Sequence, residues 1–507
     1  MSADYDLVIL GGTLEGRFAA SLAAGYGARV ALIEPPGVFE QRQQVRYLLK
    51  GLQQLAAGRE RQAVDAWFRR SESACESAFE SVFDFVGADV DELDWAALVN
   101  WSAIASKTQL LNLSPDALSA RGVDFILSTP DALSRQLVVT AGKRTLTTRA
   151  VLAAFGTVPR AEPRTNSRTD PRTEVSTDLA VPLITGIESL LMCDRLPKEI
   201  SIWGDSFEAV DWAEALNAVG VRVTLVADRF LRDEDSDVRE VVRSQLLTAG
   251  IRLISSTQRS ASSQDSSTVL QLGRHKPALV LPDFVYPPVN RYQGIDARIP
   301  ERPYLLSNSR LQTAHPRVFA CGSLLRRRAF PFTVAKHEAQ TAVRNALFLP
   351  TRRTNYNKIV QAYARFAKVG KTPKFSREGR PPIVGGYSML SASSPNSGDL
   401  SRVSPMPSYC KIICKKNRVQ SIHVLGTDAE TVVVTFASMV GRPVTELLSA
   451  AEAVTGPLTV ENLAALVRSA VFDGMGDGGA TALKSRWQPT HWRRDWAENW
   501  FNWRRSR

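Results

Sequence analysis

Residues 4–34, DYDLVILGGTLEGRFAASLAAGYGARVALIE, read as one β-α-β unit, and this unit decides the fold. The continuous apolar run at 7–10 predicts a strand that is buried on both faces. The small apolar residues at 18–25 predict a helix that packs tightly on a sheet, and residues 29–33 predict a second strand ending at Glu34. The pattern therefore predicts an α/β fold built on a parallel sheet.

The glycines after the first strand predict a dinucleotide site. Gly11 permits a tight turn and Gly16 permits close packing of helix on strand. The helix N-terminus then faces a pyrophosphate, and an acid at the end of the second strand accepts hydrogen bonds from ribose hydroxyls. The middle glycine of the motif is replaced by a β-branched residue, which we expect to crowd the ligand. The expected site residues are Gly11, Gly12, Thr13, Gly16 and Glu34.

A second β-α-β unit follows at 199–228, EISIWGDSFEAVDWAEALNAVGVRVTLVAD. It keeps Gly204 but replaces the other two glycines of the motif with Ser206 and Ala209. A small residue still lets the helix pack, and a serine hydroxyl can donate a hydrogen bond to a phosphate. We expect Gly204 and Ser206 to bind a second nucleotide.

Size and composition limit the other possibilities. A chain of 507 residues is too long for a single core, so about two to four domains are expected. No apolar stretch reaches the length of a membrane-spanning helix, and the acidic start MSADYD does not resemble a signal peptide. Five scattered cysteines fit a reducing cytoplasm rather than a disulfide framework. No metal-ligand spacing is present.

The net charge of +12 gives a pI near 9.6. Such a charge attracts anionic surfaces, although a solvated basic surface explains it equally well. No nucleic-acid motif accompanies the charge, so no nucleic-acid partner is expected.

The remaining chain predicts connecting helices and a third domain. A Pro-Pro-Gly turn at 35–37 leads to a helix up to 57, and a second helix is expected over 60–86. Residues 160–178 are polar and rich in proline, which is typical of a connection between domains. Alternating residues at 410–415 and 419–425 predict antiparallel strands, and helices are expected at 428–438, 443–454 and 459–471.

The C-terminal residues 487–507, WQPTHWRRDWAENWFNWRRSR, hold five of the ten tryptophans. On a helix, Trp492, Trp496, Trp500 and Trp503 share one face. A tryptophan stripe with arginines suits an interfacial helix on an anionic membrane. A helix that folds back on the body or docks on a partner subunit explains the stripe equally well.

The two nucleotide units resemble those of the two-dinucleotide-binding flavoproteins. The resemblance is closest to the pyridine nucleotide-disulfide oxidoreductase family, of the glutathione reductase and dihydrolipoamide dehydrogenase kind, and it covers roughly residues 4–470. Ala154-Phe155-Gly156 stands where the family has an Ala-Thr-Gly turn. The segment RVFACGS at 317–323, with Gly322 and Ser323, stands where the family's Gly-Asp closes over FAD.

The resemblance implies two Rossmann-like dinucleotide-binding domains plus a C-terminal α+β dimerisation domain, and hence a homodimer. The implied boundaries are 1–160 and 291–350 for FAD, 161–290 for NAD(P), 351–471 for dimerisation, and 472–507 for a linker and tail. The family's flavin-proximal Lys and Glu map to Arg46 and Asp211, which the resemblance makes the candidate catalytic pair; two unrelated surface charges are the alternative.

The departures from the family are equally informative. Aligning RYLL at 46–49 with the family's Lys-x-Leu-Leu puts Gly37 and Arg42 where the redox cysteines belong. The sequence GPLTVE puts Gly456 at the family's catalytic histidine, although Glu461 remains. Thiolate attack and its acid/base partner are both missing. Family-type disulfide reduction is therefore not expected.

Two functions remain open. The first is an FAD-dependent NAD(P)H oxidoreductase that passes electrons to a quinone or a soluble carrier without a redox disulfide. The second is a non-catalytic dimeric scaffold or sensor of the same fold, whose tail would allow it to associate with a membrane. The departures from every functional motif of the family favour the second function; they are Thr13, Phe155, Ser323, Gly37 and Gly456.

Overall fold

The computed structural model describes residues 3–69, 93–155, 187–227, 230–254, 268–271, 307–325, 331–371, 383–386, 409–415, 418–426 and 429–453, apart from 135 and 233. The chain divides into two compact units, residues 1–355 and 356–507. The linker and the tryptophan tail, with Trp492, Trp496, Trp500 and Trp503, lie outside the described residues, as do Gly156, Gly456 and Glu461.

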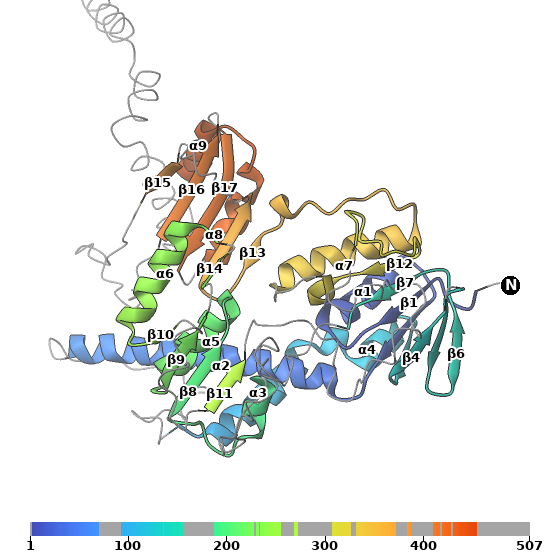
Figure 1. Cartoon of the computed structure of the whole chain (residues 1–507), viewed down its shortest axis with the longest axis horizontal. Coiled ribbons are helices and arrows are strands. Elements are labelled where there is room, and N and C mark those ends of the chain that lie inside the picture. Colours follow the sequence, from blue (N-terminus) through green and yellow to red (C-terminus); the bar gives the residue numbers. More distant parts are fainter. Residues whose placement is uncertain are drawn as a thin grey trace, which may run out of the picture. The chain divides into compact units, whose positions relative to one another are not determined.

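The first unit is built on a five-stranded parallel sheet with the order β12-β7-β1-β2-β3. Strands β12, β7 and β1 are labelled next to one another in Figure 1. Its strands are β1 (Leu7–Leu10), β2 (Val30–Glu34), β3 (Val123–Leu127), β7 (Val151–Ala153) and β12 (Val318–Ala320). Helix α1 (Leu14–Gly25) joins β1 to β2. Strand β12 arrives from far along the chain and pairs with β7. The α/β fold with a parallel sheet is confirmed.

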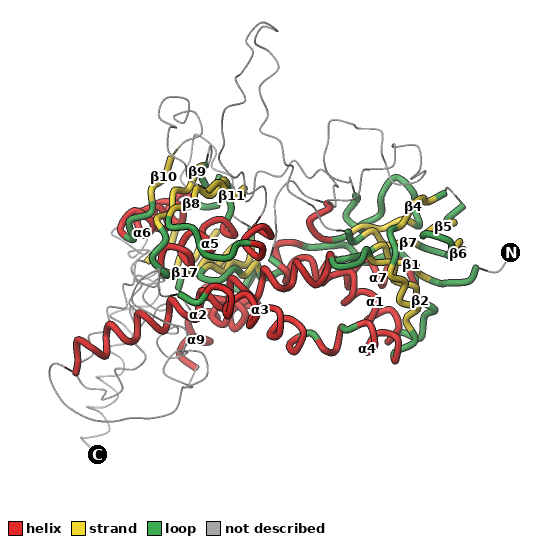
Figure 2. Tube along the Cα trace, turned by 90° about the horizontal axis from the view of Figure 1, so that it is seen from below, coloured by secondary structure: helices red, strands yellow, loops and turns green. Residues whose placement is uncertain are grey.

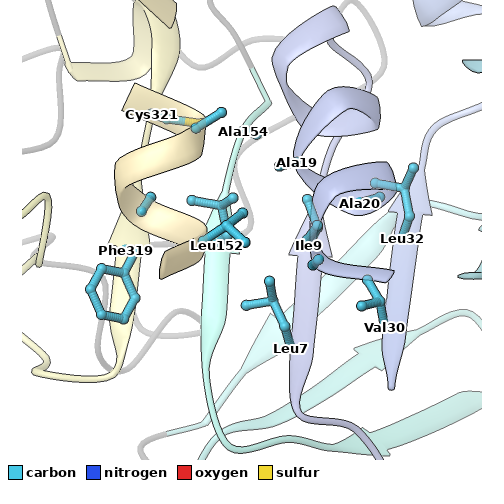
Figure 3. Close-up of a cluster of buried hydrophobic side chains, with 14 of the residues drawn as sticks. Leu7, Ile9, Ala19, Ala20, Val30, Leu32, Leu152, Ala154, Phe319 and Cys321 are labelled. Carbon is cyan, nitrogen blue, oxygen red and sulfur yellow. The ribbon is translucent and has the colours of Figure 1, made fainter. Parts of the chain in front are cut away.

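Both faces of this sheet are covered. On one face, side chains of β1, β2, β7 and β12 pack with α1 and α7 (Phe332–Leu347) in a cluster that includes Leu7, Ile9 and Phe319 (Figure 3). On the other face, Val8 and Leu10 pack against a three-stranded antiparallel sheet. Its strands are β4 (Pro130–Leu133), β5 (Val138–Ala141) and β6 (Arg144–Thr147). A strand buried on both faces explains the continuous apolar run at 7–10.

The second β-α-β unit forms a separate parallel sheet with the order β10-β9-β8-β11. Its strands are β8 (Glu199–Trp203), β9 (Arg222–Val226), β10 (Arg252–Ile254) and β11 (Thr268–Gln271). Helix α5 (Phe207–Ala218) joins β8 to β9, and α6 (Ser236–Thr248) joins β9 to β10. A short 3-10 helix at Ile187–Met192 precedes the sheet.

A long helix, α2 (Val38–Arg69), connects the first β-α-β unit to the rest (Figure 2). The expected break between two helices near residue 58 is wrong, because α2 continues through Gly58. Helix α3 (Trp95–Gln109) packs against α2 at Gly51, where an added Cβ would lie 2.7 Å from Cζ3 of Trp101. Helix α5 also contacts α2. A 3-10 turn (Leu111–Leu113) and α4 (Pro115–Ala120) lead on to β3.

The second unit holds an antiparallel sheet with the order β13-β14-β17-β16-β15. Its strands are β13 (Gln361–Ala362), β14 (Phe366–Gly370), β15 (Ile383–Gly386), β16 (Tyr409–Lys415) and β17 (Arg418–Leu425). Helices α8 (Ala429–Phe436) and α9 (Val444–Ala453) pack on one face of the sheet, where Cys410 and Cys414 are buried free thiols. Short 3-10 turns lie at Tyr356–Lys358 and Ala437–Met439. Of the helices that the structure describes, none is both long enough and apolar enough to cross a membrane.

Candidate nucleotide-binding site

The turn between β1 and α1 has the geometry that the glycine motif predicts. Gly12 has φ +117°, which only glycine adopts without strain. A Cβ on Gly11 would lie 2.7 Å from Cδ1 of Leu32, and a Cβ on Gly16 would lie 3.4 Å from Cβ of Ala154. The glycines therefore let α1 start close to the carboxyl ends of β1, β2 and β7, at the edge where nucleotides bind in such sheets.

Thr13 is the N-cap of α1. Its hydroxyl accepts a hydrogen bond from Gly16 N at 3.2 Å and donates one to Ala154 O at 2.7 Å. The side chain is buried and ties the start of the helix to the end of β7. The β-branched residue thus stabilises the turn, and it also takes up one of the amide donors at the helix N-terminus.

Glu34 ends β2, at the position expected of a ribose-binding acid, but a neighbouring arginine already occupies it. Arg17 donates from Nε to Oε2 of Glu34 at 2.9 Å and from Nη2 to Oε1 at 2.5 Å. Glu34 is 0% exposed and Arg17 is 3% exposed. The guanidinium also donates to Glu40 Oε1 at 3.0 Å, and it lies 3.4 Å from the centre of the Phe39 ring. The two carboxylate oxygens face the arginine rather than solvent.

A second buried acid stands at the N-terminus of α1. Glu15 is buried against Gly322, where an added Cβ would lie 2.1 Å from its Oε1. Gly322 N in turn donates to Oε2 of the fully buried Glu338 at 2.9 Å. Burial raises the pKa of Glu15, and the nearby charge of Glu338 adds to the rise, while Arg42 opposes it. Ser323 follows Gly322 in a 3-10 turn (Gly322–Leu325) and is half-buried.

One cation also lies at this end of the sheet. Arg42, on α2, donates from Nη1 to Phe155 O at 2.9 Å and to Gly12 O at 3.4 Å. Phe155 itself is buried. Gly37, the other residue mapped to a redox cysteine, precedes α2 with φ +77°. A guanidinium beside the glycine turn supplies positive charge where a diphosphate would bind.

In the second β-α-β unit, Gly204 N donates to Val226 O at 3.1 Å at the end of β8. Ser206 is the N-cap residue of α5 and is buried, and among the described residues its hydroxyl has no hydrogen-bond partner. A buried hydroxyl without a partner at a helix N-terminus is free to bind a phosphate. Glu208, in the first turn of α5, has its pKa raised to about 7 by burial and by the charge of Glu188.

The candidate catalytic pair lies on two helices that contact each other, α2 and α5. Arg46 is exposed, and its guanidinium carbon lies 5.4 Å from the centre of the Phe332 ring at the start of α7. Asp211 is buried on α5. In the part of the chain that the structure describes, no group of three or more His, Cys, Asp or Glu side chains could hold a metal ion.

Sequence reasoning missed the roles of Arg17 and Glu15. A signal was present: both charged residues flank Gly16 at the start of a helix that is otherwise small and apolar. Charged side chains there must be buried against the sheet or the turn, so each needs a partner or a shifted pKa.

Comparisons with known proteins place these features in a family. The model of the pyridine nucleotide-disulphide oxidoreductases matches residues 5–346. The chain belongs to this family. Dihydrolipoyl dehydrogenase from Acholeplasma laidlawii is 26% identical over 374 residues, which cover 70% of this chain and 100% of the relative. Dihydrolipoyl dehydrogenase from Bacillus subtilis (strain 168) is 28% identical over 261 residues, or 50% of this chain and 51% of the relative.

Two solved structures share the fold. The HOCl-induced flavoprotein disulfide reductase RclA from Escherichia coli has a TM-score of 0.62 and 17% identity, covering 91% of this chain and 99% of its own. LpdA from Mycobacterium tuberculosis has a TM-score of 0.64 and 15% identity, covering 91% of this chain and 98% of its own. The resemblance to the pyridine nucleotide-disulfide oxidoreductase family is confirmed, together with its two-Rossmann α/β fold.

The dihydrolipoyl dehydrogenase-like members of the family are oxidoreductases that use FAD and NAD(P)H. The described residues fit both groups in part. Gly12, the amides of α1 and Arg42 fit a diphosphate, and the Ser206 hydroxyl fits a second nucleotide. Glu34 stands at the position expected of a ribose-binding acid, but Arg17 occupies both of its carboxylate oxygens.

Proposed function

We propose that this chain is an FAD-dependent NAD(P)H oxidoreductase that passes electrons to a small acceptor, such as a quinone or a soluble carrier, without a redox disulfide. FAD, when bound, would accept a hydride from the nicotinamide and pass the electrons on to the acceptor. Arg42 and the start of α1 would hold the diphosphate, Glu34 the ribose, and Gly204 with Ser206 the nicotinamide nucleotide.

The absence of thiols at the start of α2 carries this proposal. Gly37 and Arg42 stand where the family resemblance expects the two redox cysteines, and the chain has no cysteine before Cys75. The guanidinium of Arg42 is bound to the carbonyls of Gly12 and Phe155. A guanidinium can orient an anion but cannot exchange with a disulfide. Electrons on the flavin would therefore go directly to the acceptor.

Arg46 and Asp211 would tune the flavin in this proposal. Helices α2 and α5, which carry them, contact each other. A cation near the flavin favours its reduced, anionic form, and an acid on α5 would help to orient the nicotinamide. The family resemblance also favours a homodimer.

The test is to load the full chain with FAD and add NADH or NADPH without oxygen. We expect the flavin absorbance to bleach, and then to return when menadione is added. Lipoamide and 5,5′-dithiobis(2-nitrobenzoate) serve as disulfide probes and should not restore it. Reoxidation by lipoamide at a rate similar to that of menadione would refute the proposed acceptor class.

The Arg17–Glu34 ion pair favours a second candidate, a non-catalytic scaffold or sensor of the same fold. In this buried pair, Arg17 occupies the carboxylate that would otherwise bind the ribose of FAD. The same spectrum decides between the two functions. Flavin that binds and is bleached by NADH or NADPH excludes the scaffold, whereas a chain that takes up no flavin on reconstitution supports it.

A further inference from the structure

We infer that Arg17 acts as an internal ligand of the FAD site: its guanidinium takes the place of the adenosine ribose on Glu34, so that FAD binds only by displacing it and is held as an exchangeable cofactor. This inference rests on the proposed FAD site. It concerns how tightly the site holds FAD, and not which acceptor the enzyme reduces.

The contacts of Arg17 show how completely it occupies the ribose position. Its Nε and Nη2 groups donate to the two carboxylate oxygens of Glu34, at 2.9 and 2.5 Å respectively. Nη1 donates to Leu113 O at 3.2 Å, and Nη2 also donates to Glu40. A bidentate arginine–carboxylate contact is among the strongest side-chain pairings. A ribose hydroxyl would therefore have to compete with a charged donor.

Burial makes this competition unavoidable. With Glu34 0% exposed and Arg17 3% exposed, the carboxylate is out of contact with solvent while the arginine is in place. Phe39 covers the guanidinium on one side, with 3.4 Å between the guanidinium carbon and the ring centre. Phe125 lies 5.5 Å from it. The aromatic contacts hold the plane of the guanidinium and strengthen the closed state.

The surroundings also provide an alternative position for the arginine. Glu40, on α2, contacts Arg17 Nη2 at 3.0 Å, and its side chain is 51% exposed. A guanidinium that leaves Glu34 can keep this more exposed acid as its partner. The site therefore has two arrangements, closed on Glu34 or turned toward Glu40, and FAD favours the second.

The experiment measures FAD binding to the full chain, freed of flavin, by the change in FAD fluorescence. Arg17→Gln removes the positive charge and the two-point hydrogen bond to the carboxylate, but it keeps an amide donor near Glu34. Arg29→Gln is the matched control, because Arg29, just before β2, also pairs with an acid, Asp6, just before β1, in a more exposed contact. Arg17→Gln should tighten FAD binding by about tenfold or more, since a hydrogen bond to a charged group is worth roughly that factor. Arg29→Gln should leave the dissociation constant within about twofold, the scale of an exposed ion pair.

Glu34→Gln in the Arg17→Gln background completes the test. The gain should disappear in the double variant, because it depends on the carboxylate that the arginine releases. If Arg17→Gln does not fold, Arg17→Lys takes its place. The lysine keeps the positive charge but loses the two-point hydrogen bond, so it should give a smaller gain in FAD affinity. Equal or weaker FAD binding by the Arg17 variant, including no binding at all, overturns the inference. Bound flavin that NADH and NADPH leave oxidised would instead refute the proposed function.

Discussion

The contact between Glu15 and Gly322 allows a sharp test of the site geometry. A Cβ on Gly322 would lie 2.1 Å from Oε1 of Glu15 and 3.0 Å from its Cδ, and Gly322 has φ +78°. Gly322→Ala therefore has two costs in the free energy of unfolding. The left-handed backbone costs about 1–2 kcal/mol in any non-glycine residue. Overpacking against the carboxyl adds about 1–3 kcal/mol.

Two further variants separate these costs. Gly27 has φ +76°, and a Cβ added there would have nothing within 4 Å. Gly27→Ala should therefore show only the cost of the left-handed backbone. In the Glu15→Ala background, Gly322→Ala should also fall to about 1–2 kcal/mol, because the clash is gone. Calorimetric unfolding of wild type, Gly322→Ala, Glu15→Ala and the double variant gives the coupling between residues 15 and 322, expected at about 1–3 kcal/mol. Additive effects would show that Glu15 does not lie against Gly322.

Two other predictions concern the cap of α1 and a histidine of the second unit. Thr13→Val should destabilise the first unit by about 1–2 kcal/mol, because the N-cap bond to Gly16 and the bond to Ala154 O are lost. Thermal melts should show Thr13→Ser close to wild type. A Thr13→Val chain as stable as wild type would contradict the capping role of Thr13. Burial, with Lys368 and Lys411 nearby, lowers the pKa of His423 from 6.5 to about 3. Only the unfolded chain then binds a proton as the pH falls below 6.5, so the second unit should lose about 1.4 kcal/mol of stability per pH unit, or about 2 kcal/mol by pH 5. Denaturant unfolding of wild type and His423→Phe between pH 7 and 5 measures this, and an equal pH dependence in both chains would contradict it.

The pattern of apolar residues along the chain made the framework of the fold predictable. The apolar run at 7–10, the glycine turn and the terminal Glu34 indicate a buried parallel strand and its neighbours without reference to distant residues. The break near Gly58 was the wrong part of the prediction. A glycine within a helix costs only about 1 kcal/mol relative to alanine, and a long helix with packed neighbours absorbs that cost.

The side-chain contacts within the candidate site were less predictable, because they depend on where side chains point. That Thr13 crowds a ligand stays a prediction, and the sequence did not indicate that its hydroxyl caps α1 and donates to Ala154 O. The distance in sequence between Arg17 and Glu34 gives no sign that they form a buried pair. Only the packing of α1 against the end of β2 brings them together. The roles of Arg46, Asp211 and Ser323 remain predictions.

The central claim is that electrons pass through the flavin without a redox disulfide. Anaerobic reductive titration of the FAD-loaded full chain with dithionite tests it most directly, because a dithiol–disulfide pair stores two electrons in addition to those of the flavin. We predict that the flavin is fully reduced after one two-electron equivalent per bound FAD, with no new thiols detected afterwards. Uptake of a second equivalent, with two new thiols per chain, would contradict the account.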